Sequence, residues 1–295
     1  MNLLDFGKLI TAMVTPFKDD LSVDYEAAAR LADHLVNNGS DGLVITGTTG
    51  ESCTLTMEES VELYKVVKST VSGRASVIAG SGSNSTKEAL YLTKGAEGAG
   101  VDASLQVAPY YNKPSQAGFF AHFKTIAENT GLPLILYNIP GRTGKNVDAE
   151  TIIKLSEVEN IVGVKEASGD LEQVSKIVSD TSDDFLLYSG EDFLTLPILC
   201  LGGDGVISVA SHIAGNDMKE MIEAYAAGDN VKALRIHQKL APLFKVLFIN
   251  SNPIPVKAAL NMVGMNVGSL RSPLVEATDE EKSKIKNVLS GLGLV

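Results

Sequence analysis

The stretch Ile161-Val-Gly-Val-Lys-Glu-Ala-Ser-Gly169 is a short apolar run with β-branched side chains that contains a lysine and breaks at a glycine. A run of this kind is typical of a buried parallel strand. Because side chains alternate along a strand, Lys165 is expected on the face of Ile161 and Gly163, with the intervening valines on the other. Burial disfavours the charged form of lysine and lowers its pKa, which leaves a free amine that attacks carbonyl groups. The alternative is a surface lysine at a fraying strand end.

Seven further apolar runs resemble this one, and the eight runs start about 20 to 35 residues apart. In chain order they are Leu9–Thr15, Gly42–Gly47, Ser76–Gly82, Ala103–Pro109, Pro133–Ile139, Ile161–Ala167, Phe185–Glu191 and Asp204–Ala210. Strand–helix alternation repeated eight times predicts an α/β fold, a (β/α)8 TIM barrel. The alternative is a doubly wound open sheet, which usually has a Gly-rich turn after its first strand, whereas this chain has Thr15-Pro-Phe-Lys18.

Helical signals separate the apolar runs. Residues 25–38 have an apolar face, follow the expected cap Asp24 and end at Gly39. Three segments match the capping box, in which a hydroxyl and a carboxylate bind free amide groups: Thr56–Glu59, Ser85–Glu88 and Thr278–Glu281. Further helix caps are expected at Ser115, Asp148 and Asp170.

The predicted barrel is complete near Ala210 plus one helix, so a catalytic barrel domain is expected over residues 1–225. Residues 226–295 carry further helical patterns around Val231–Ile249, Pro255–Val263 and Glu280–Leu289. This part is predicted to be a C-terminal helical extension that packs on the barrel or on a neighbouring subunit.

Composition limits the classes of protein and of site. Of the 295 residues, 44% are hydrophobic, and no apolar run reaches the roughly 18 residues needed to cross a bilayer. The net charge of −11 argues against nucleic acid or an anionic membrane as a partner. The first eight residues do not resemble a signal peptide, and Cys53 and Cys200 are widely separated, so a cytoplasmic protein with two buried thiols is expected. The histidines form no cluster, and no metal site is expected.

Unusual residues fall at the ends of the predicted strands, where barrels of this kind carry their chemistry. The second run leads into Gly47-Thr-Thr-Gly-Glu-Ser52, whose glycines and hydroxyls suit an anion such as a carboxylate. The fourth leads into Tyr110 and Tyr111, which either relay protons or pack at an interface. The fifth contains Tyr137, a phenol that can point into the barrel and shuttle protons. Arg142 follows, with a fork that fits a carboxylate, and its alternative is a surface ion pair.

Lys165 therefore shares one rim of the predicted barrel with threonine, tyrosine and arginine side chains. A nucleophilic amine, phenolic proton carriers, a hydroxyl relay and a carboxylate-binding fork together predict an enzyme that forms a Schiff base with a 2-oxo acid. Protonation of that imine acidifies the neighbouring carbon and allows a carbon–carbon bond to form or break. This chemistry requires no metal and no organic cofactor. The alternative from another class is a barrel that binds a 2-oxo acid as a sensor without turnover.

The chain resembles the pyruvate-dependent class I aldolases of the N-acetylneuraminate lyase superfamily, and within them the dihydrodipicolinate synthases. The resemblance covers nearly the whole chain. Its markers are TPF (15–17), GTTGES (47–52), VIAGSGSNST (77–86), APYYNKPSQ (108–116), YNIPGRTG (137–144), GVKEASGD (163–170), SGED (189–192) and GVISV (205–209). It implies condensation of pyruvate with L-aspartate 4-semialdehyde to 4-hydroxy-tetrahydrodipicolinate, the first committed step of lysine and diaminopimelate biosynthesis. It also implies a homotetramer built as a dimer of dimers.

The resemblance implies a role for each matching catalytic residue. Lys165 forms the imine with pyruvate, and Tyr137 is the proton donor and acceptor over that imine. Thr48 links Tyr137 to Tyr111, which reaches across a tight dimer interface into the partner's site.

Four further residues are implied to bind the substrates. Thr49 helps to hold the pyruvate carboxylate, Arg142 binds the carboxylate of the semialdehyde, and the backbone groups of Gly190 and Ile207 line the site. Sister enzymes that act on N-acetylneuraminate or on 2-keto-3-deoxy sugar acids share the lysine, the tyrosine of strand five and a similar threonine loop. Arg142 within PGRTG and the tyrosine pair favour the synthases over these sister enzymes.

Regulated members of the family bind lysine in a pocket at the tight dimer interface. The matching residues, which form the candidate effector site, are Ser52, Asn84, Glu88 and Tyr110. Two positions that are often histidine in regulated bacterial members are Met57 and Ser60 in this chain, which departs from the regulated pattern there.

Overall fold

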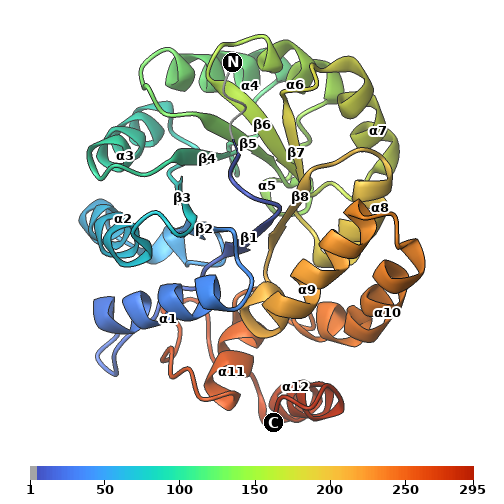
Figure 1. The fold of residues 1–295 in the computed structure, drawn as a ribbon. Coiled ribbons are helices and arrows are strands. Elements are labelled where there is room, and N and C mark those ends of the chain that lie inside the picture. The colour runs from blue at the N-terminus through green and yellow to red at the C-terminus, as the bar shows by residue number, and fades with distance from the viewer. Residues whose placement is uncertain (1–4) are drawn as a thin grey trace.

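The computed structural model describes residues 5–295 and contains a closed barrel of eight parallel strands, in which β8 pairs with β1 (Figure 1). The strands are β1 (Leu9–Ala12), β2 (Gly42–Ile45), β3 (Ser76–Gly80), β4 (Ala103–Val107), β5 (Leu134–Asn138), β6 (Ile161–Glu166), β7 (Leu186–Ser189) and β8 (Gly205–Ser208). All eight predicted strands and the barrel are confirmed. Each strand ends before its apolar run does, because the last residues of the run leave the sheet and enter the loops of one rim.

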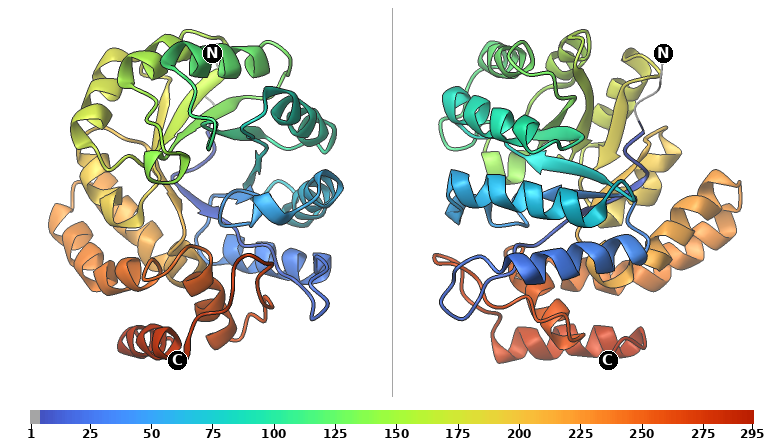
Figure 2. Two further views of the ribbon diagram at one scale, coloured as in Figure 1. Left: turned by 180° about the vertical axis from the view of Figure 1, so that it is seen from behind. Right: turned by 60° about the vertical axis from the view of Figure 1, so that its left-hand side comes forward.

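A ring of helices surrounds the strands, as the views in Figures 1 and 2 show. In the described chain this ring consists of α1 (Tyr25–Asn37), α2 (Met57–Val71), α3 (Thr86–Gly98), α4 (Gln116–Ala127), α6 (Ala149–Ser156), α7 (Leu171–Asp180), α8 (Thr195–Cys200) and α9 (Ser211–Ala226). Three short elements lie in loops that follow strands: η1 (Ser52–Thr54), α5 (Pro140–Thr143) and η2 (Asp192–Leu194). The helices bury the outer faces of the strands, so both faces of the sheet are covered.

Three more helices form the C-terminal extension: α10 (Asn230–Val246), α11 (Ile254–Met262) and α12 (Asp279–Gly291). They confirm the three helical segments predicted for this part of the chain. Helix α10 packs along α9, and α11 packs against α12 at the lower edge of Figure 1. The backbone N–H of Phe17 donates to the carbonyl of Val267 at 3.1 Å, which joins the extension to the loop after β1. The expected boundary at residue 225 lies at the end of α9, and the division into two domains stays a prediction.

Most predicted helix caps are confirmed. Thr56 and Thr278 each form a complete capping box, with their hydroxyls accepting from an N–H and the paired glutamates accepting in return. Asp24, Ser115 and Asp170 each accept a hydrogen bond from an N–H of the helix that follows. These local signals therefore set the starts of five helices.

Two caps differ from the prediction. The Ser85 hydroxyl accepts from the N–H of Glu88, but the Glu88 carboxylate accepts from the Ser83 hydroxyl at 2.9 Å instead of completing the box. The Ser85 N–H donates to the Ser83 hydroxyl, which is therefore the acceptor in place of the Glu88 carboxylate. Asp148 precedes α6 without capping it through its side chain, because its carboxylate accepts from Asn146.

The predicted alternation along β6 is correct at its end and wrong at its start. Ile161 pairs with Leu134, but the next pair along the ladder is Gly163 with Ile135, so one residue of β6 is skipped. This irregularity turns Ile161 outward, where it packs with the helices instead of sharing the face of Lys165. The Lys165 face itself points into the barrel, as predicted.

Three aspartates lie at the N-terminal end of the barrel, where the strands begin. One lies directly before each of β2, β4 and β8, and its carboxylate accepts from an N–H near the start of the preceding strand. The pairs are Leu9 with Asp41 (3.0 Å), Val77 with Asp102 (2.8 Å) and Leu187 with Asp204 (2.7 Å). These contacts satisfy strand ends that would otherwise lack partners, so this end serves stability.

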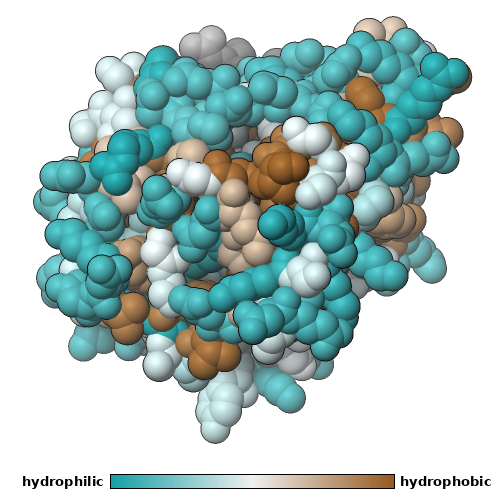
Figure 3. All heavy atoms as spheres, turned by 90° about the horizontal axis from the view of Figure 1, so that it is seen from below, coloured by the Kyte–Doolittle hydropathy of each residue, from teal (hydrophilic) through white to brown (hydrophobic). Residues whose placement is uncertain are grey.

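Figure 3 shows that the face seen from below is largely hydrophilic, with apolar side chains gathered in small patches. Cys53 and Cys200 are both exposed, so the prediction of two buried thiols is wrong. Each belongs to a short surface element, η1 or α8, and not to the core. Among residues 5–295, no helix has the length and apolar character needed to cross a membrane.

Candidate active site

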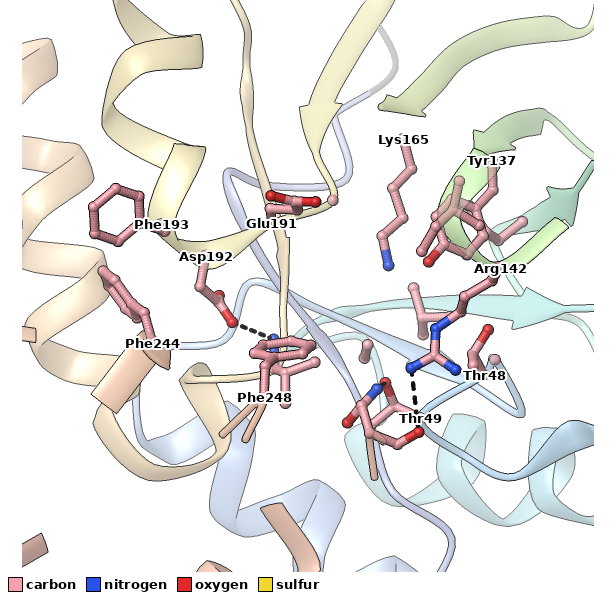
Figure 4. Close-up of a pocket in the computed structure, with 18 residues that line it drawn as sticks. Thr48, Thr49, Tyr137, Arg142, Lys165, Glu191, Asp192, Phe193, Phe244 and Phe248 are labelled. Carbon is pink, nitrogen blue, oxygen red and sulfur yellow. Dashed lines mark hydrogen bonds between the residues drawn. The ribbon is translucent and has the colours of Figure 1, made fainter. Parts of the chain in front are cut away.

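A cavity of about 360 Å³ opens at the C-terminal ends of the strands (Figure 4). It brings together six residues predicted from the sequence: Lys165, Tyr137, Thr48, Thr49, Arg142 and Gly190. These residues come from β5, β6 and the loops after β2, β5 and β7. They are neighbours because the sheet closes into a barrel. The predicted residues Tyr111 and Ile207 do not belong to the lining of this cavity.

The side chain of Lys165 extends from β6 into the cavity, and only 6% of the residue is exposed. Its Nζ lies 4.3 Å from the centroid of the ring of Tyr137, the residue opposite it in the β5–β6 ladder. Burial lowers the pKa of Lys165 to about 8, the Arg142 guanidinium adds to this effect, and the Asp192 carboxylate opposes it. Within residues 5–295, Lys165 forms no ion pair. At pH 7 about a tenth of its amine is therefore uncharged and nucleophilic.

Tyr137, at the end of β5, keeps its proton under ordinary conditions. Burial raises the pKa of this phenol to about 12, with a further contribution from the Glu191 carboxylate. The Arg142 guanidinium and a hydrogen bond with the Thr48 hydroxyl act in the opposite direction on the pKa. The amine lies over the face of this ring and the Thr48 hydroxyl lies beside its phenol, so a neutral phenol at this position is suited to exchange protons.

The loop between β2 and η1 brings Thr48 and Thr49 to the cavity. It is bounded by Thr46 and Glu51, which both have a left-handed φ of 57°. The loop lies so close to β3 that a Cβ on Gly80 would stand 2.6 Å from the Thr46 carbonyl oxygen. The glycine is therefore required at that position, and the strained backbone of the loop places two adjacent threonines at one cavity wall.

Arg142 reaches the cavity from α5, directly after β5. In Figure 4 its guanidinium lies between Tyr137 and Thr49. Its Nη2 donates to the backbone carbonyl of Asn252 at 3.3 Å. The remaining donors of its fork leave a cationic group beside the threonine loop, which suits a substrate carboxylate.

Asp192 and Asn252 are cavity residues to which the sequence analysis gave no role. The Asp192 carboxylate is buried and accepts from the Ser208 hydroxyl and from the N–H groups of Val209 and Ala210. Burial raises the pKa of Asp192, while these donors and Lys165 lower it. The SGED stretch was a usable signal for Asp192, because an acid directly after a buried strand falls at the functional rim. Asn252 carries no such signal, since it lies in the C-terminal extension.

Aromatic side chains form another wall of the cavity. They are Phe193 from η2, Phe244 from α10 and Phe248 from the turn after α10. Phe193 and Phe248 are about half exposed, whereas Phe244 is buried. In Figure 4 they lie on the side of the cavity away from Lys165 and Arg142, and Asp192 lies on that side with them.

Two predicted site residues lie elsewhere in this single chain. Tyr111 follows β4, has a left-handed φ of 71° and is 88% exposed, so within one subunit it touches no part of the cavity. Ile207, on β8, is buried in the barrel interior in the same apolar cluster as Tyr137. Their roles remain predictions.

The four candidate effector residues lie in one region beside the loop after β4. Asn84 donates through Nδ2 to the carbonyl of Tyr110 at 3.2 Å. Burial, and after it Cys53 and the Glu88 carboxylate, raise the pKa of the Tyr110 phenol. Ser52 is the neighbour of Cys53 in η1. The structure thus places an acid, an amide and a phenol in one region, and their role as an effector site stays a prediction.

Comparison with known proteins agrees with this geometry. The model of the "Dihydrodipicolinate synthetase family" matches residues 5–292. A protein of Desulforamulus reducens named 4-hydroxy-tetrahydrodipicolinate synthase is 54% identical over 100% of both chains. One of the same name from Nostoc punctiforme is 55% identical over 99% of both chains. The crystal structure of such an enzyme from Cyanidioschyzon merolae, with lysine bound, has 53% identity and a TM-score of 0.97 over 98% of this chain and 99% of its own.

Proposed function

The chain belongs to the dihydrodipicolinate synthetase family, and we propose that it condenses pyruvate with L-aspartate 4-semialdehyde to give 4-hydroxy-tetrahydrodipicolinate. This lyase reaction is the first committed step of lysine and diaminopimelate biosynthesis. The assignment is supported by relatives that bear the name of this activity and are 54% and 55% identical over nearly the full length of both chains. A biosynthetic role agrees with the cytoplasmic location expected from the sequence.

The single observation that carries the proposal is the environment of Lys165. Its amine is buried in a cavity, its pKa is lowered to about 8, and it lies against the ring of a tyrosine that retains its proton. A buried lysine without an ion-pair partner is unfavourable for folding, so its presence indicates a chemical role. The adjoining hydroxyl and guanidinium groups add the donors that a keto acid requires.

The first half of the reaction forms a covalent intermediate. The uncharged Nζ of Lys165 attacks C2 of pyruvate, and loss of the former carbonyl oxygen as water leaves an imine. Tyr137 supplies and removes the protons of this step, and Thr48 gives its phenol a neighbouring hydroxyl with which to exchange them. The imine cation then draws electrons from the methyl carbon, which gives a proton to the Tyr137 phenolate left by that step and becomes the nucleophile of an enamine.

The second half forms the carbon–carbon bond and releases the enzyme. The enamine carbon attacks the aldehyde of the second substrate, and the new alkoxide takes a proton from the Tyr137 phenol, which regains one from the attacking amino group in the next step. The substrate's amino group next attacks the imine carbon, displaces the Lys165 amine and closes the ring. One water is lost overall, in the imine-forming step, so atoms and charges balance. Thr49 holds the pyruvate carboxylate and Arg142 the semialdehyde carboxylate, with Gly190 and Ile207 contributing backbone groups.

We assign Tyr111 to the active site of a neighbouring subunit. Its 88% exposure and strained backbone in the single chain support a position at a contact between copies. A second group of exposed apolar residues, Val231 and Leu234 on α10, lies on the other side of the barrel. Exposed Tyr111 in one place and exposed Val231 and Leu234 in another support the homotetramer, a dimer of dimers, that the resemblance implies.

Lysine is the proposed effector at the cluster of Ser52, Asn84, Glu88 and Tyr110. The Glu88 carboxylate suits the ammonium groups of lysine, and the relative from Cyanidioschyzon merolae was solved with lysine bound. Titration of lysine during turnover tests this assignment, and an unchanged rate at millimolar lysine would reject it.

Turnover assays test the proposed reaction itself. Purified protein is incubated with pyruvate and L-aspartate 4-semialdehyde, and the cyclic product is followed by mass spectrometry. Parallel reactions contain N-acetylneuraminate or a 2-keto-3-deoxy sugar acid. Product from the semialdehyde alone is expected, whereas cleavage of a sugar acid without semialdehyde turnover would identify a sister aldolase.

A further inference from the structure

Asn252 lies in the segment between α10 and α11, outside the barrel, yet it lines the cavity. Only 6% of the residue is exposed. It is a neighbour of the threonine loop and of Arg142, which precede it in the sequence by 203 and 110 residues. The C-terminal extension thus supplies one polar group to a site otherwise built mainly by the barrel's rim.

Two hydrogen bonds connect Asn252 to the proposed holders of both substrates. Its Nδ2 donates to the Oγ1 of Thr49 at 2.8 Å. Its backbone carbonyl accepts from the Nη2 of Arg142 at 3.3 Å. No other residue in the described chain forms hydrogen bonds to both groups. One side chain and one backbone oxygen of the same residue therefore fix the threonine and the arginine relative to each other.

The direction of the first hydrogen bond determines what Thr49 can do. A hydroxyl has one proton and two acceptor positions, and Asn252 occupies an acceptor position of Thr49. The single proton of the Thr49 hydroxyl is then left to point at an anion in the cavity. In this arrangement the Oδ1 of Asn252 is buried and has no hydrogen-bond partner among residues 5–295. A residue selected for stability alone would avoid that unpaired oxygen.

Further contacts join the barrel and the extension next to Asn252. In the same loop as Thr49, Glu51 forms a buried ion pair with Lys257 of α11, with 2.8 Å between Nζ and Oε1. The backbone N–H of Arg271 donates to the other oxygen of Glu51 at 3.0 Å. The segment that carries Asn252 is therefore anchored to the threonine loop only five residues beyond Asn252.

We propose that Asn252 is a positioning residue that orients the Thr49 hydroxyl toward the keto-acid carboxylate and holds Arg142 for the carboxylate of the aldehyde substrate. This inference rests on the proposed function. It goes beyond it in assigning the relative placement of the two carboxylates to the C-terminal extension. A change of the Asn252 side chain should affect pyruvate binding more than semialdehyde binding. The side chain bonds directly to Thr49, whereas Arg142 is bound by the backbone carbonyl.

The test uses full-length Asn252→Ala and Asn252→Asp, with Asn250→Ala as the matched control. Asn250 lies in the same segment, and its Nδ2 bonds to Glu281, away from the cavity. In Asn252→Asp the new carboxylate accepts the Thr49 proton and repels the keto acid, so KM for pyruvate should rise roughly tenfold or more. In Asn252→Ala both KM values should rise severalfold, pyruvate more than semialdehyde, with kcat changed less than about threefold. The control should match the unmodified protein.

A second readout separates positioning from folding. Thr49→Val and Thr49→Val/Asn252→Ala should have nearly the same KM for pyruvate, because the second change removes a contact already lost. Unchanged KM values in both Asn252 variants would overturn the inference, as would a fall in kcat alone or additive effects in the double variant. Failure of the unmodified protein to turn over the semialdehyde would instead reject the proposed function.

Discussion

Two buried lysines of this chain, Lys165 and Lys257, have the same aromatic contact and different partners. Each Nζ lies 4.3 Å from the centroid of an aromatic ring, Tyr137 for Lys165 and Phe17 for Lys257. Lys257 is 1% exposed and pairs with Glu51 at 2.8 Å, whereas Lys165 is 6% exposed and has no ion pair among the described residues.

The difference lies in the charges that surround each amine. Burial lowers the pKa of both residues, but at Lys257 the Glu51 carboxylate opposes this effect at contact distance. At Lys165 the opposing carboxylate, Asp192, is directed at Ser208 and two backbone N–H groups. Burial and an aromatic ring therefore do not suffice; a free amine also requires an open cavity and no bound carboxylate.

The largest expected effect is on catalysis at Lys165. Lys165→Met should lower kcat by roughly 10³-fold or more, because no other group of the site forms the imine. Its melting temperature should stay the same or rise, since an apolar side chain of similar length replaces a buried amine without a partner. Turnover assays and thermal unfolding check both parts, and an active variant would end the distinction between the two lysines.

The reverse outcome is expected for Lys257. Lys257→Met leaves the Glu51 carboxylate buried without its cation, so the free energy of unfolding should fall by about 3–5 kcal/mol. The folded fraction should still form the pyruvate imine at Lys165. Urea unfolding measures the loss, with Lys282→Met as a control because its ion pair with Glu276 is exposed. Equal stability of Lys257→Met and Lys282→Met would show that the buried ion pair does not stabilise the fold.

The pH dependence of imine formation measures the pKa of Lys165 directly. Only the deprotonated amine attacks pyruvate, so below the pKa of about 8 the rate should rise about tenfold per pH unit and then level off. Tyr137, with a pKa of about 12, should cause no decline below pH 10. Trapping rates between pH 6 and 10 give the profile. A flat profile, or one still rising steeply at pH 10, would mean that the amine is not perturbed.

The smallest effects are shifts of that profile. Arg142 lowers the pKa of Lys165 and Asp192 raises it. Arg142→Ala should therefore move the profile to higher pH and Asp192→Asn to lower pH, each by less than about one unit. Arg142→Ala should also weaken use of the semialdehyde while leaving the pyruvate imine intact at high pH. Shifts in the same direction for both variants would contradict the charge assignment.

The sequence contains most of the information for the fold and for the central part of the site. Apolar runs gave all eight strands, and strand ends gave Lys165 and Tyr137, because the residues that matter lie at a fixed point of a repeated unit. Patterns along the chain do not show where a ladder skips a residue, and so Ile161 was placed on the wrong face.

Contacts between residues far apart in the sequence could not be predicted from local patterns. Asn252 meets Thr49 across 203 residues, through a segment that has no strand end or cap to mark it. Lys257 likewise appears in the sequence as one lysine of an amphipathic helix, and only the fold brings Glu51 to it. Tyr111 lies outside the cavity of the single chain, and its proposed place at a neighbouring subunit is a contact that no local pattern describes.

Reductive trapping tests the central claim, that an unpaired buried amine captures the keto acid. The protein is treated with pyruvate and borohydride, digested, and each lysine-containing peptide is examined by mass spectrometry. A reduced pyruvyl adduct on Lys165 and an unmodified Lys257 are the expected result. An unmodified Lys165, or equal labelling of Lys257, would contradict the account.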